Sequence, residues 1–170
     1  MRRDRKFNGR KREKPEYDQK LLDLARVTRV VKGGRRFRFR ATLVIGNRKG
    51  KVGVGVGKGS DVSDAIKKAF DDGKKKIIFI KTVKNTIPHD IYWKQGSARI
   101  ILKPAKEGRG IVAGGAVRAV VEFAGIKDIV SKSLGTSNKL NVARATLSAL
   151  DSLKDSKTRA MRMNRGQESK

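Results

Sequence analysis

Cysteine is absent from this 170-residue sequence, and histidine occurs once, as His89. A chain without cysteine forms no disulfide, no thiolate nucleophile and no zinc site built on sulfur. A single histidine leaves a histidine-based metal centre or acid–base pair without its second member. We therefore expect no metal ion, no cofactor and no catalytic residue in this protein.

Long apolar runs are also missing. No stretch of the sequence approaches the roughly 18 consecutive apolar residues that a membrane-spanning helix needs. Residues 1–6 are mostly charged and lack the apolar segment of a secretion signal. We expect a cytoplasmic protein, or one in the matrix or stroma of an organelle, with no membrane partner.

Acidic side chains are scarce beside basic ones. Lys and Arg number 43 and Asp and Glu number 16, which gives a net charge of +27 and a pI near 11.1. A small domain needs a net charge of only about 2–8 to stay soluble. A field of this strength attracts a polyanion, and binding to phosphates would weaken steeply with salt. The charge therefore favours a nucleic-acid partner over the alternative, a basic protein that is merely soluble.

The basic residues are concentrated at both ends of the chain. Residues 1–14 hold eight basic and two acidic side chains, and residues 154–170 hold six and two. Segments of this composition cannot bury enough surface to fold alone. We predict a basic disordered arm over residues 1–19 and a basic tail over 156–170 that order on a partner. A solubilising tail is the alternative for the last residues.

Between the ends, the hydrophobic pattern predicts an α+β protein with two compact units, residues 20–84 and 85–155. Each unit is small enough for burial alone to give marginal stability, so we expect the two to pack together. The first unit should have the order α-β-β-β-α, which is the layout of a double-stranded-RNA-binding domain. Its expected elements are a helix over 21–25, strands over 27–31, 36–45 and 51–57, and a second helix capped by Ser60 or Asp61; a further strand over 77–83 should follow that helix.

The second unit is expected to begin after a junction at residues 84–88. A hairpin should turn at Gln95 and Gly96, and a glycine-rich loop over 107–115 should lead into a helix that Gly125 ends. A strand over 128–134 and a last helix capped by Asn141 complete the prediction.

The strongest functional signal lies in the strands of the first unit. Arg36, Arg38 and Arg40 alternate with apolar residues, so they share one face of a strand, and unpaired arginines are too costly to bury. Glycines on the neighbouring strand would let another backbone approach closely. An ordinary solvated face is the alternative, but such faces usually mix both charge signs. We predict RNA contact at Lys32, Gly33, Gly34, Arg35, Arg36, Arg38, Arg40, Lys49, Lys51, Gly53, Gly55, Gly57, Lys58, Lys67 and Lys68.

Two glycine-rich stretches suggest nucleotide binding, but neither completes a motif. Residues 53–60 have Gly59 where a P-loop needs Ser or Thr, and residues 108–115 are one residue longer than the dinucleotide fingerprint. The second stretch also resembles the phosphate loop of small-molecule kinases. Such an enzyme needs carboxylates for metal and base, and only Glu107, Glu122 and Asp128 lie nearby. We expect no enzyme and no small-molecule substrate.

The aromatic residues of the second unit leave two interpretations open. Tyr92 and Trp93 could stack on bases. Because they lie on an apolar hairpin, we expect them instead to fill the core of the second unit or the junction between the units. His89, which has no partner histidine or cysteine, is expected at the surface.

Four motifs, in order, resemble the family of the fifth protein of the small ribosomal subunit in its bacterial form. The resemblance covers roughly residues 20–155. The motifs are Val30–Phe39, Gly50–Lys58, Pro104–Val120, and Gly135–Asn138 followed by Asn141–Thr146.

This resemblance implies a double-stranded-RNA-binding-like first domain and an α/β second domain that shares its fold with small-molecule kinases but not their catalysis. It implies a place in the small subunit, with ribosomal RNA and small-subunit ribosomal proteins four and eight as partners. It also implies a position near the mRNA entrance and an effect on decoding accuracy. Lys32–Arg36 would reach ribosomal RNA, and Asn138 and Arg144 would touch RNA or protein eight. Protein four would be met by Arg109, Gly110, Gly114, Gly115 and Arg118.

Two other functions are kept as alternatives. A free-standing RNA chaperone would bind RNA but sediment apart from the small subunit. A small-molecule kinase would turn over ATP and lose that activity when Gly110 is replaced by alanine, and we expect no such turnover.

Overall fold

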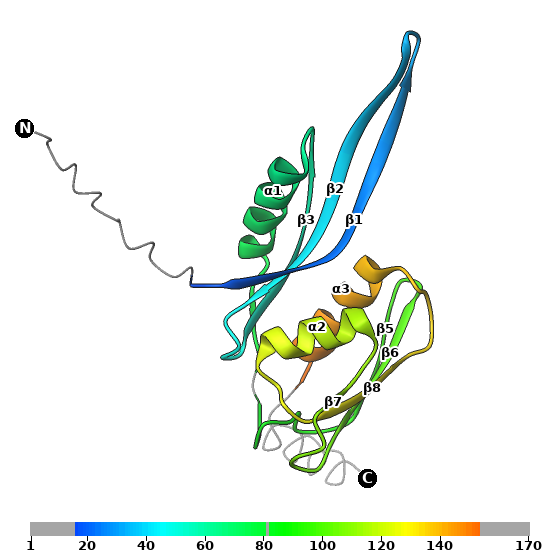
Figure 1. The fold of residues 1–170 in the computed structure, drawn as a ribbon. Helices are drawn as coiled ribbons and strands as arrows, with labels where there is room; N and C mark the ends of the chain where they lie inside the picture. The colour runs from blue at the N-terminus through cyan, green and yellow to red at the C-terminus, as the bar shows by residue number, and fades with distance from the viewer. Residues whose placement is uncertain (1–15, 81, 154–170) are drawn as a thin grey trace, which may run out of the picture.

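The computed structural model describes residues 16–80 and 82–153, and these fold into two four-stranded sheets and three helices (Figure 1). The α+β class expected from the sequence is confirmed. Among the described residues, no helix has the length and apolar content to span a membrane. Residues 1–15 of the arm predicted over 1–19, and the whole tail predicted over 156–170, lie outside the described residues.

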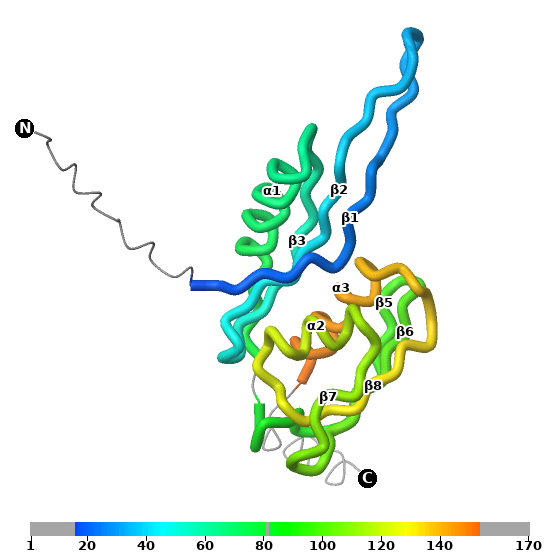
Figure 2. Tube along the Cα trace, viewed as in Figure 1, coloured from blue at the N-terminus to red at the C-terminus, as the bar shows by residue number. Residues whose placement is uncertain are grey.

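The first sheet has the strand order β1-β2-β3-β4, and every neighbouring pair is antiparallel. Helix α1 lies against one face of this sheet (Figure 2). A small core forms between them from Ala41, Leu43, Ala65 and Ala69, with three partly buried neighbours. The elements are β1 (Asp18–Val31), β2 (Gly34–Gly46), β3 (Lys51–Gly59), α1 (Val62–Lys75) and β4 (Ile78–Phe79).

The predicted helix over residues 21–25 is wrong, because this segment belongs to β1. The strand begins at Asp18, inside the range predicted as an arm, and pairs with β2 along its whole length. A β-bulge between Leu21 and Asp23 interrupts the alternation expected of a strand, which is why the leucines here resemble a helical pattern. The bulge places Leu22 against the core shared with the second unit, while Leu21 and Leu24 pair with β2 residues on the α1 side. A five-residue helix would also be too short to be stable by itself.

The second sheet has the strand order β5-β6-β8-β7, and only β7 and β8 run parallel. The predicted hairpin is confirmed, but its turn is at Gly96 and Ser97, one residue later than predicted. Gly125 ends α2 with a left-handed backbone at φ 86°. Asn138, not Asn141, caps the last helix, because its side-chain oxygen accepts the backbone N–H of Leu140 at 3.1 Å. The elements are β5 (Ile91–Gln95), β6 (Ala98–Pro104), β7 (Ile111–Val112), α2 (Gly115–Ala124), β8 (Ile129–Ser133) and α3 (Lys139–Asp151).

One core joins the two units, as expected from their small size. Val44, Val52 and Val54 of the first sheet are buried in the same cluster as the apolar residues of α2 and α3. The turn between β2 and β3 is also tied to α2, since Arg48 N–H donates to the Phe123 carbonyl at 3.0 Å. The first sheet is therefore covered by α1 on one face and by the second unit on part of the other.

Candidate nucleic-acid interface

The first two strands form a hairpin that leaves the body of the protein (Figures 1 and 2). The burial of β2 changes abruptly along its length: Gly34–Arg40 is exposed or half-buried, whereas Ala41–Gly46 is buried throughout. The turn at Lys32 and Gly33 forms the tip. An isolated two-stranded hairpin is only marginally stable in water. We therefore expect a binding partner to stabilise the projecting end.

The projecting part of the hairpin carries only positive charge. No acidic residue occurs between Leu24 and Ser60 in the sequence. Five of its cations are predicted from the sequence to contact RNA; the two on β1 are not, because the alternation of arginines with apolar residues occurs only on β2. The hairpin cations are Arg26, Arg29, Lys32, Arg35, Arg36, Arg38 and Arg40.

Strand register divides these cations between two faces. Arg29 is paired directly with Arg36, and Arg40 with Lys58 of β3, so the face turned away from α1 is densely cationic. Like charges directly opposite each other destabilise a sheet. Among the described residues, no carboxylate lies within ion-pair distance of Arg29 or Arg36. The repulsion between these two arginines would be relieved by a polyanion.

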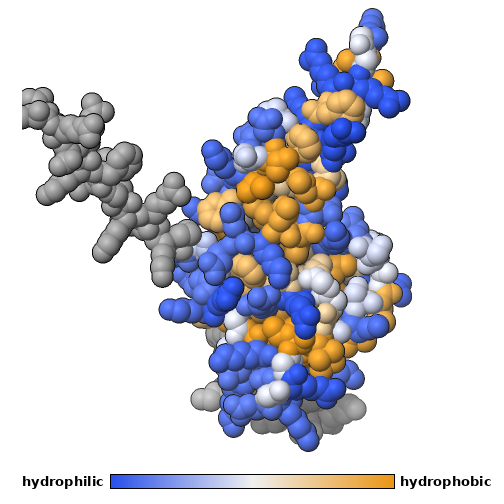
Figure 3. Space-filling model, viewed as in Figure 1, coloured by the Kyte–Doolittle hydropathy of each residue, from blue (hydrophilic) through white to orange (hydrophobic). Residues whose placement is uncertain are grey.

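The face on the α1 side has a different chemistry. The guanidinium of Arg26 lies 4.4 Å from the centre of the Phe37 ring, and the Phe37 side chain is 48% exposed. Val30, near the tip, is 76% exposed. In Figure 3 the hairpin is a mostly hydrophilic projection with apolar patches along it. One face is therefore suited to phosphates, and the other offers apolar and stacking contacts.

An acidic contact marks the base of the hairpin. Asp23 accepts the Lys139 ammonium of α3 at 3.0 Å and lies 3.7 Å from the Arg40 guanidinium. The Nε atom of Arg40 is buried without a hydrogen-bond partner among the described residues. Asp23 therefore links the point where the hairpin leaves the sheet to the second unit.

The predicted role of the β3 glycines is wrong. Gly53, Gly55 and Gly57 are buried, and the backbone that approaches them is that of α1 rather than RNA. A Cβ added at Gly55 would lie 2.0 Å from the Ala69 carbonyl oxygen, and one at Gly57 would lie 2.4 Å from that of Ala65. The glycines do permit close approach, but the partner is a helix of the same chain.

The other residues assigned to RNA lie apart from the hairpin tip. Lys49 is in the turn at the opposite end of the sheet and Lys51 opens β3 there. Lys67 and Lys68 are exposed on α1, where Lys68 pairs with Asp64 at 2.7 Å. Asn138 and Arg144 are exposed on the second unit, at and within α3.

The carboxylate of Asp72 on α1 accepts a hydrogen bond from the outer edge of β3. The Asp72 carboxylate of α1 accepts the Val56 N–H at 3.0 Å and the Lys76 ammonium at 2.6 Å. Burial alone would raise the pKa of Asp72, but the bonds from Lys76 and Val56 outweigh it and hold the pKa below its ordinary value of 3.8. The helix therefore satisfies an edge N–H that β4 does not reach.

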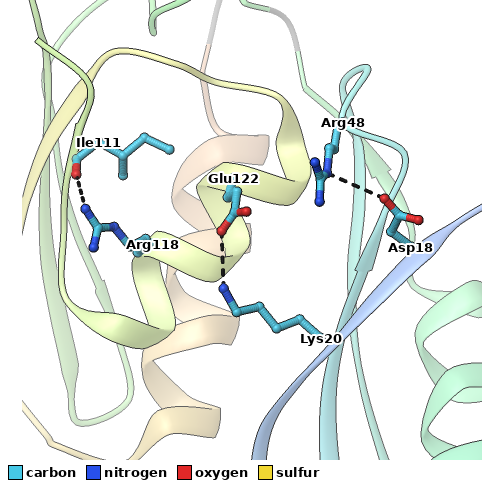
Figure 4. Close-up of polar contacts among 6 residues, drawn as sticks. All are labelled: Asp18, Lys20, Arg48, Ile111, Arg118 and Glu122. Carbon is cyan, nitrogen blue, oxygen red and sulfur yellow. Dashed lines mark hydrogen bonds and ion pairs between the residues drawn. The ribbon is translucent and has the colours of Figure 1, made fainter.

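The glycine-rich loop before α2 is held by side chains from α2 and from the residue that precedes β8. Gly110 N–H donates to the buried carboxylate of Asp128 at 2.8 Å. Arg118 Nη2 donates to the Ile111 carbonyl at 2.9 Å, as Figure 4 shows. Glu122 pairs with Lys20 of β1 at 3.2 Å. Two of the three carboxylates considered for a kinase therefore have structural partners. Among the described residues, no group of three or more His, Cys, Asp or Glu side chains could hold a metal ion.

Comparison with known proteins gives consistent matches over both units. The family model "Ribosomal protein S5, N-terminal domain" matches residues 17–81, and "Ribosomal protein S5, C-terminal domain" matches residues 93–163. The proteins named small ribosomal subunit protein uS5 from Campylobacter jejuni strains 81-176 and RM1221 are each 57% identical over 139 residues. The alignment covers 82% of this chain and 95% of each relative.

Proposed function

This chain belongs to the ribosomal protein S5 family, and from that membership we propose that it is a structural constituent of the small ribosomal subunit. Proteins of this family are structural and not enzymatic. The chain would then work in the cytoplasm, within the subunit, and its main partner would be ribosomal RNA.

The observation that carries the RNA part of the proposal is the pairing of Arg29 with Arg36 on the projecting hairpin. In a protein with no anionic partner, we would expect an acidic side chain near one of these arginines to offset their repulsion. Arginine forms two parallel hydrogen bonds with a phosphate, so a strand pair of facing arginines is suited to a phosphate backbone. We propose that the hairpin cations, together with Lys58, hold ribosomal RNA by charge and shape.

Finer roles follow from the family resemblance and the accessibility of the residues. We propose that the start of α2 meets small-subunit ribosomal protein four, since a Cβ at Gly114 or Gly115 would meet no atom within 4 Å among the described residues. Arg109, Gly110 and Arg118 would belong to the same contact. Asn138 and Arg144 would meet RNA or protein eight. A location near the mRNA entrance and an effect on decoding accuracy complete this proposal.

The fold names predicted from the sequence also belong here. The first unit has the three strands and the following helix of a double-stranded-RNA-binding domain, but within residues 16–80 no helix precedes β1. The second unit has the strand, glycine loop and helix that suggested small-molecule kinases. We propose both as architectural likenesses without shared catalysis.

Charge reversal at the hairpin tests the proposed function. Arg36→Glu combined with Arg38→Glu should weaken binding to small-subunit ribosomal RNA by at least about tenfold and lower the salt slope by about 2. The same variant should co-sediment poorly with the small subunit. Lys74→Glu combined with Lys75→Glu, on the last turn of α1, makes the same change in net charge at residues given no RNA role. Equal losses in both variants, or none in the first, would contradict the proposal. Strong RNA binding without co-sedimentation would favour a free RNA chaperone.

A further inference from the structure

The second sheet has one face that the described helices leave uncovered. Its inner face packs on α2 and α3, with Ile100, Leu102 and Ile129 fully buried in the shared core. Figure 1 shows both helices on the same side of this sheet. Because side chains alternate along a strand, the residues between these core positions point to the opposite side. This outer face consists of Tyr92, Lys94, Arg99, Ile101, Lys103, Val112, Val130 and Lys132.

Register places these residues in three rows across the strands. Tyr92, Ile101 and Lys132 are direct neighbours in one row. Lys103, Val130 and Val112 form the next row, and Lys94 faces Arg99 in the third. The outer face therefore has an apolar centre with cations around it. Strands β5, β6, β7 and β8 contain no acidic residue.

The two aromatic residues of β5 have opposite surroundings. Trp93 is half-buried and packs against the shared core, as expected from its place on an apolar hairpin. Tyr92 is 59% exposed, so its predicted core position is wrong. A tyrosine held on a strand, exposed to solvent beside Ile101 and in the same row as Lys132, is a flat platform. Every base has a face that can stack on such a ring.

We propose that the outer face binds an unpaired stretch of RNA, with one base stacked on Tyr92 and the flanking phosphates on the surrounding cations. The proposal rests on the proposed function, because the RNA would be that of the small subunit, but it adds a second site on the other unit. Strands lie about 4.8 Å apart and residues on one face repeat about every 6.7 Å. A face of this size accommodates two or three nucleotides, as other four-stranded sheets with exposed aromatics do.

The charges favour RNA over a protein partner at this face. Cores of protein interfaces are depleted in lysine, whereas three of the four cations here are lysines. A protein would have to supply several carboxylates to neutralise them. RNA supplies one negative charge with every nucleotide and a base for the ring.

Two kinds of variant of the full chain separate stacking from charge. Binding is measured against a short, fluorescently labelled unpaired RNA over a range of salt concentrations. Tyr92→Ala should weaken binding at least about fivefold and leave the salt slope unchanged, because stacking releases no counterions. Tyr92→Phe should restore affinity to within about twofold. Lys103→Gln combined with Lys132→Gln should lower the salt slope by about 1.4, which is about 0.7 for each lost phosphate contact.

Controls keep each outcome decisive. Lys74→Gln combined with Lys75→Gln removes the same charge from α1 and should leave the slope unchanged. Trp93 emission, from the inner side of the same strand, should match the wild type if the variants fold. Unchanged affinity in a folded Tyr92→Ala variant would overturn the proposal. The proposed function would still stand if the Arg36→Glu and Arg38→Glu double variant binds ribosomal RNA more weakly than the wild type. If neither variant loses affinity, both the outer-face proposal and the proposed function are contradicted.

A protein partner predicts another pattern. Tyr92→Ala would then bind free RNA like the wild type but co-sediment less with the small subunit. That result would assign the outer face to protein contact and would also overturn the proposal.

Discussion

The two halves of β2 have the same alternating pattern but different surroundings. In the outer half, Phe37 is 48% exposed; in the inner half, Leu43 on the same face is 2% exposed under α1. The opposite face changes from Arg36 and Arg38 to the buried Val44. Alternation therefore tells which residues share a face, but the elements that cover the face decide whether it becomes core or interface. The outer half is left for a partner because neither α1 nor the second unit reaches it.

The glycines at the two ends of the first sheet also have different surroundings. At the tip, Gly33 has open space around its Cα among the described residues, and Gly34 is needed for a positive φ of 130°. At the base, Gly55 is in contact with the backbone of α1. Glycine thus serves a turn at one end and helix packing at the other.

The largest effect on stability is expected from Gly55→Ala. The new methyl group would lie 2.0 Å from the Ala69 carbonyl oxygen and 2.4 Å from the Gly73 nitrogen, and neither backbone atom can move without shifting α1. We expect a loss of about 3 kcal/mol or more in the free energy of unfolding, at the upper end of overpacking effects. Urea denaturation followed by far-UV circular dichroism measures this loss.

Gly33→Ala is the matched control at the exposed end. A Cβ at this position meets nothing within 4 Å among the described residues, so stability should change by no more than about 0.5 kcal/mol. Similar losses at Gly33 and Gly55 would show that packing against α1 is not what distinguishes the two ends.

The sequence predicted the parts of the fold that depend on local signals. The strands on either side of the Lys32–Gly34 turn, the helix that begins after Asp61 and the Gly125 stop of α2 each follow from spacing, capping, turn chemistry or a left-handed cap. The cationic tip was also visible, because arginines without acids cannot form a core. These signals need only the residues next to one another in the chain.

What the sequence could not give depends on contacts between distant residues. The β3 glycines predict a close neighbour, but nothing local says that the neighbour is α1. The bulge between Leu21 and Asp23 breaks the alternation of a strand, so the leucines around it resemble the apolar spacing of a helix. Arg26 and Arg29 were missed because their role comes from pairing with the opposite strand. Tyr92 and Trp93 could be told apart only once the register of β5 was known.

A smaller effect is expected where the two halves of the hairpin meet. Asp23 lies between Arg40 and Lys139, and its side chain is 32% exposed. Exposed and half-exposed ion pairs contribute little, so Asp23→Asn should cost about 1 kcal/mol of unfolding free energy. A double-mutant cycle with Lys139→Gln should give a coupling energy of about 0.5–1 kcal/mol. The exposed Asp64–Lys68 pair of α1 is the comparison, with an expected coupling of about 0.3–0.5 kcal/mol. Strict additivity at Asp23 and Lys139 would mean that the contact does not fasten the hairpin to the second unit.

The smallest effect is expected in the pH dependence of stability, through the Asp72 carboxylate of α1. Because the pKa of Asp72 is lowered in the folded protein, its contribution to stability is present above the unfolded value of 3.8 and is lost as pH falls through the folded pKa. Asp72→Asn should therefore be less stable than the wild type near neutral pH, and the gap should close below the ordinary pKa. Urea unfolding at a series of pH values measures that gap. A gap that stays constant across the pH series would contradict a stabilising role for the Asp72 carboxylate. The hairpin has no carboxylate between Leu24 and Lys58, so this acid range removes no negative charge from it.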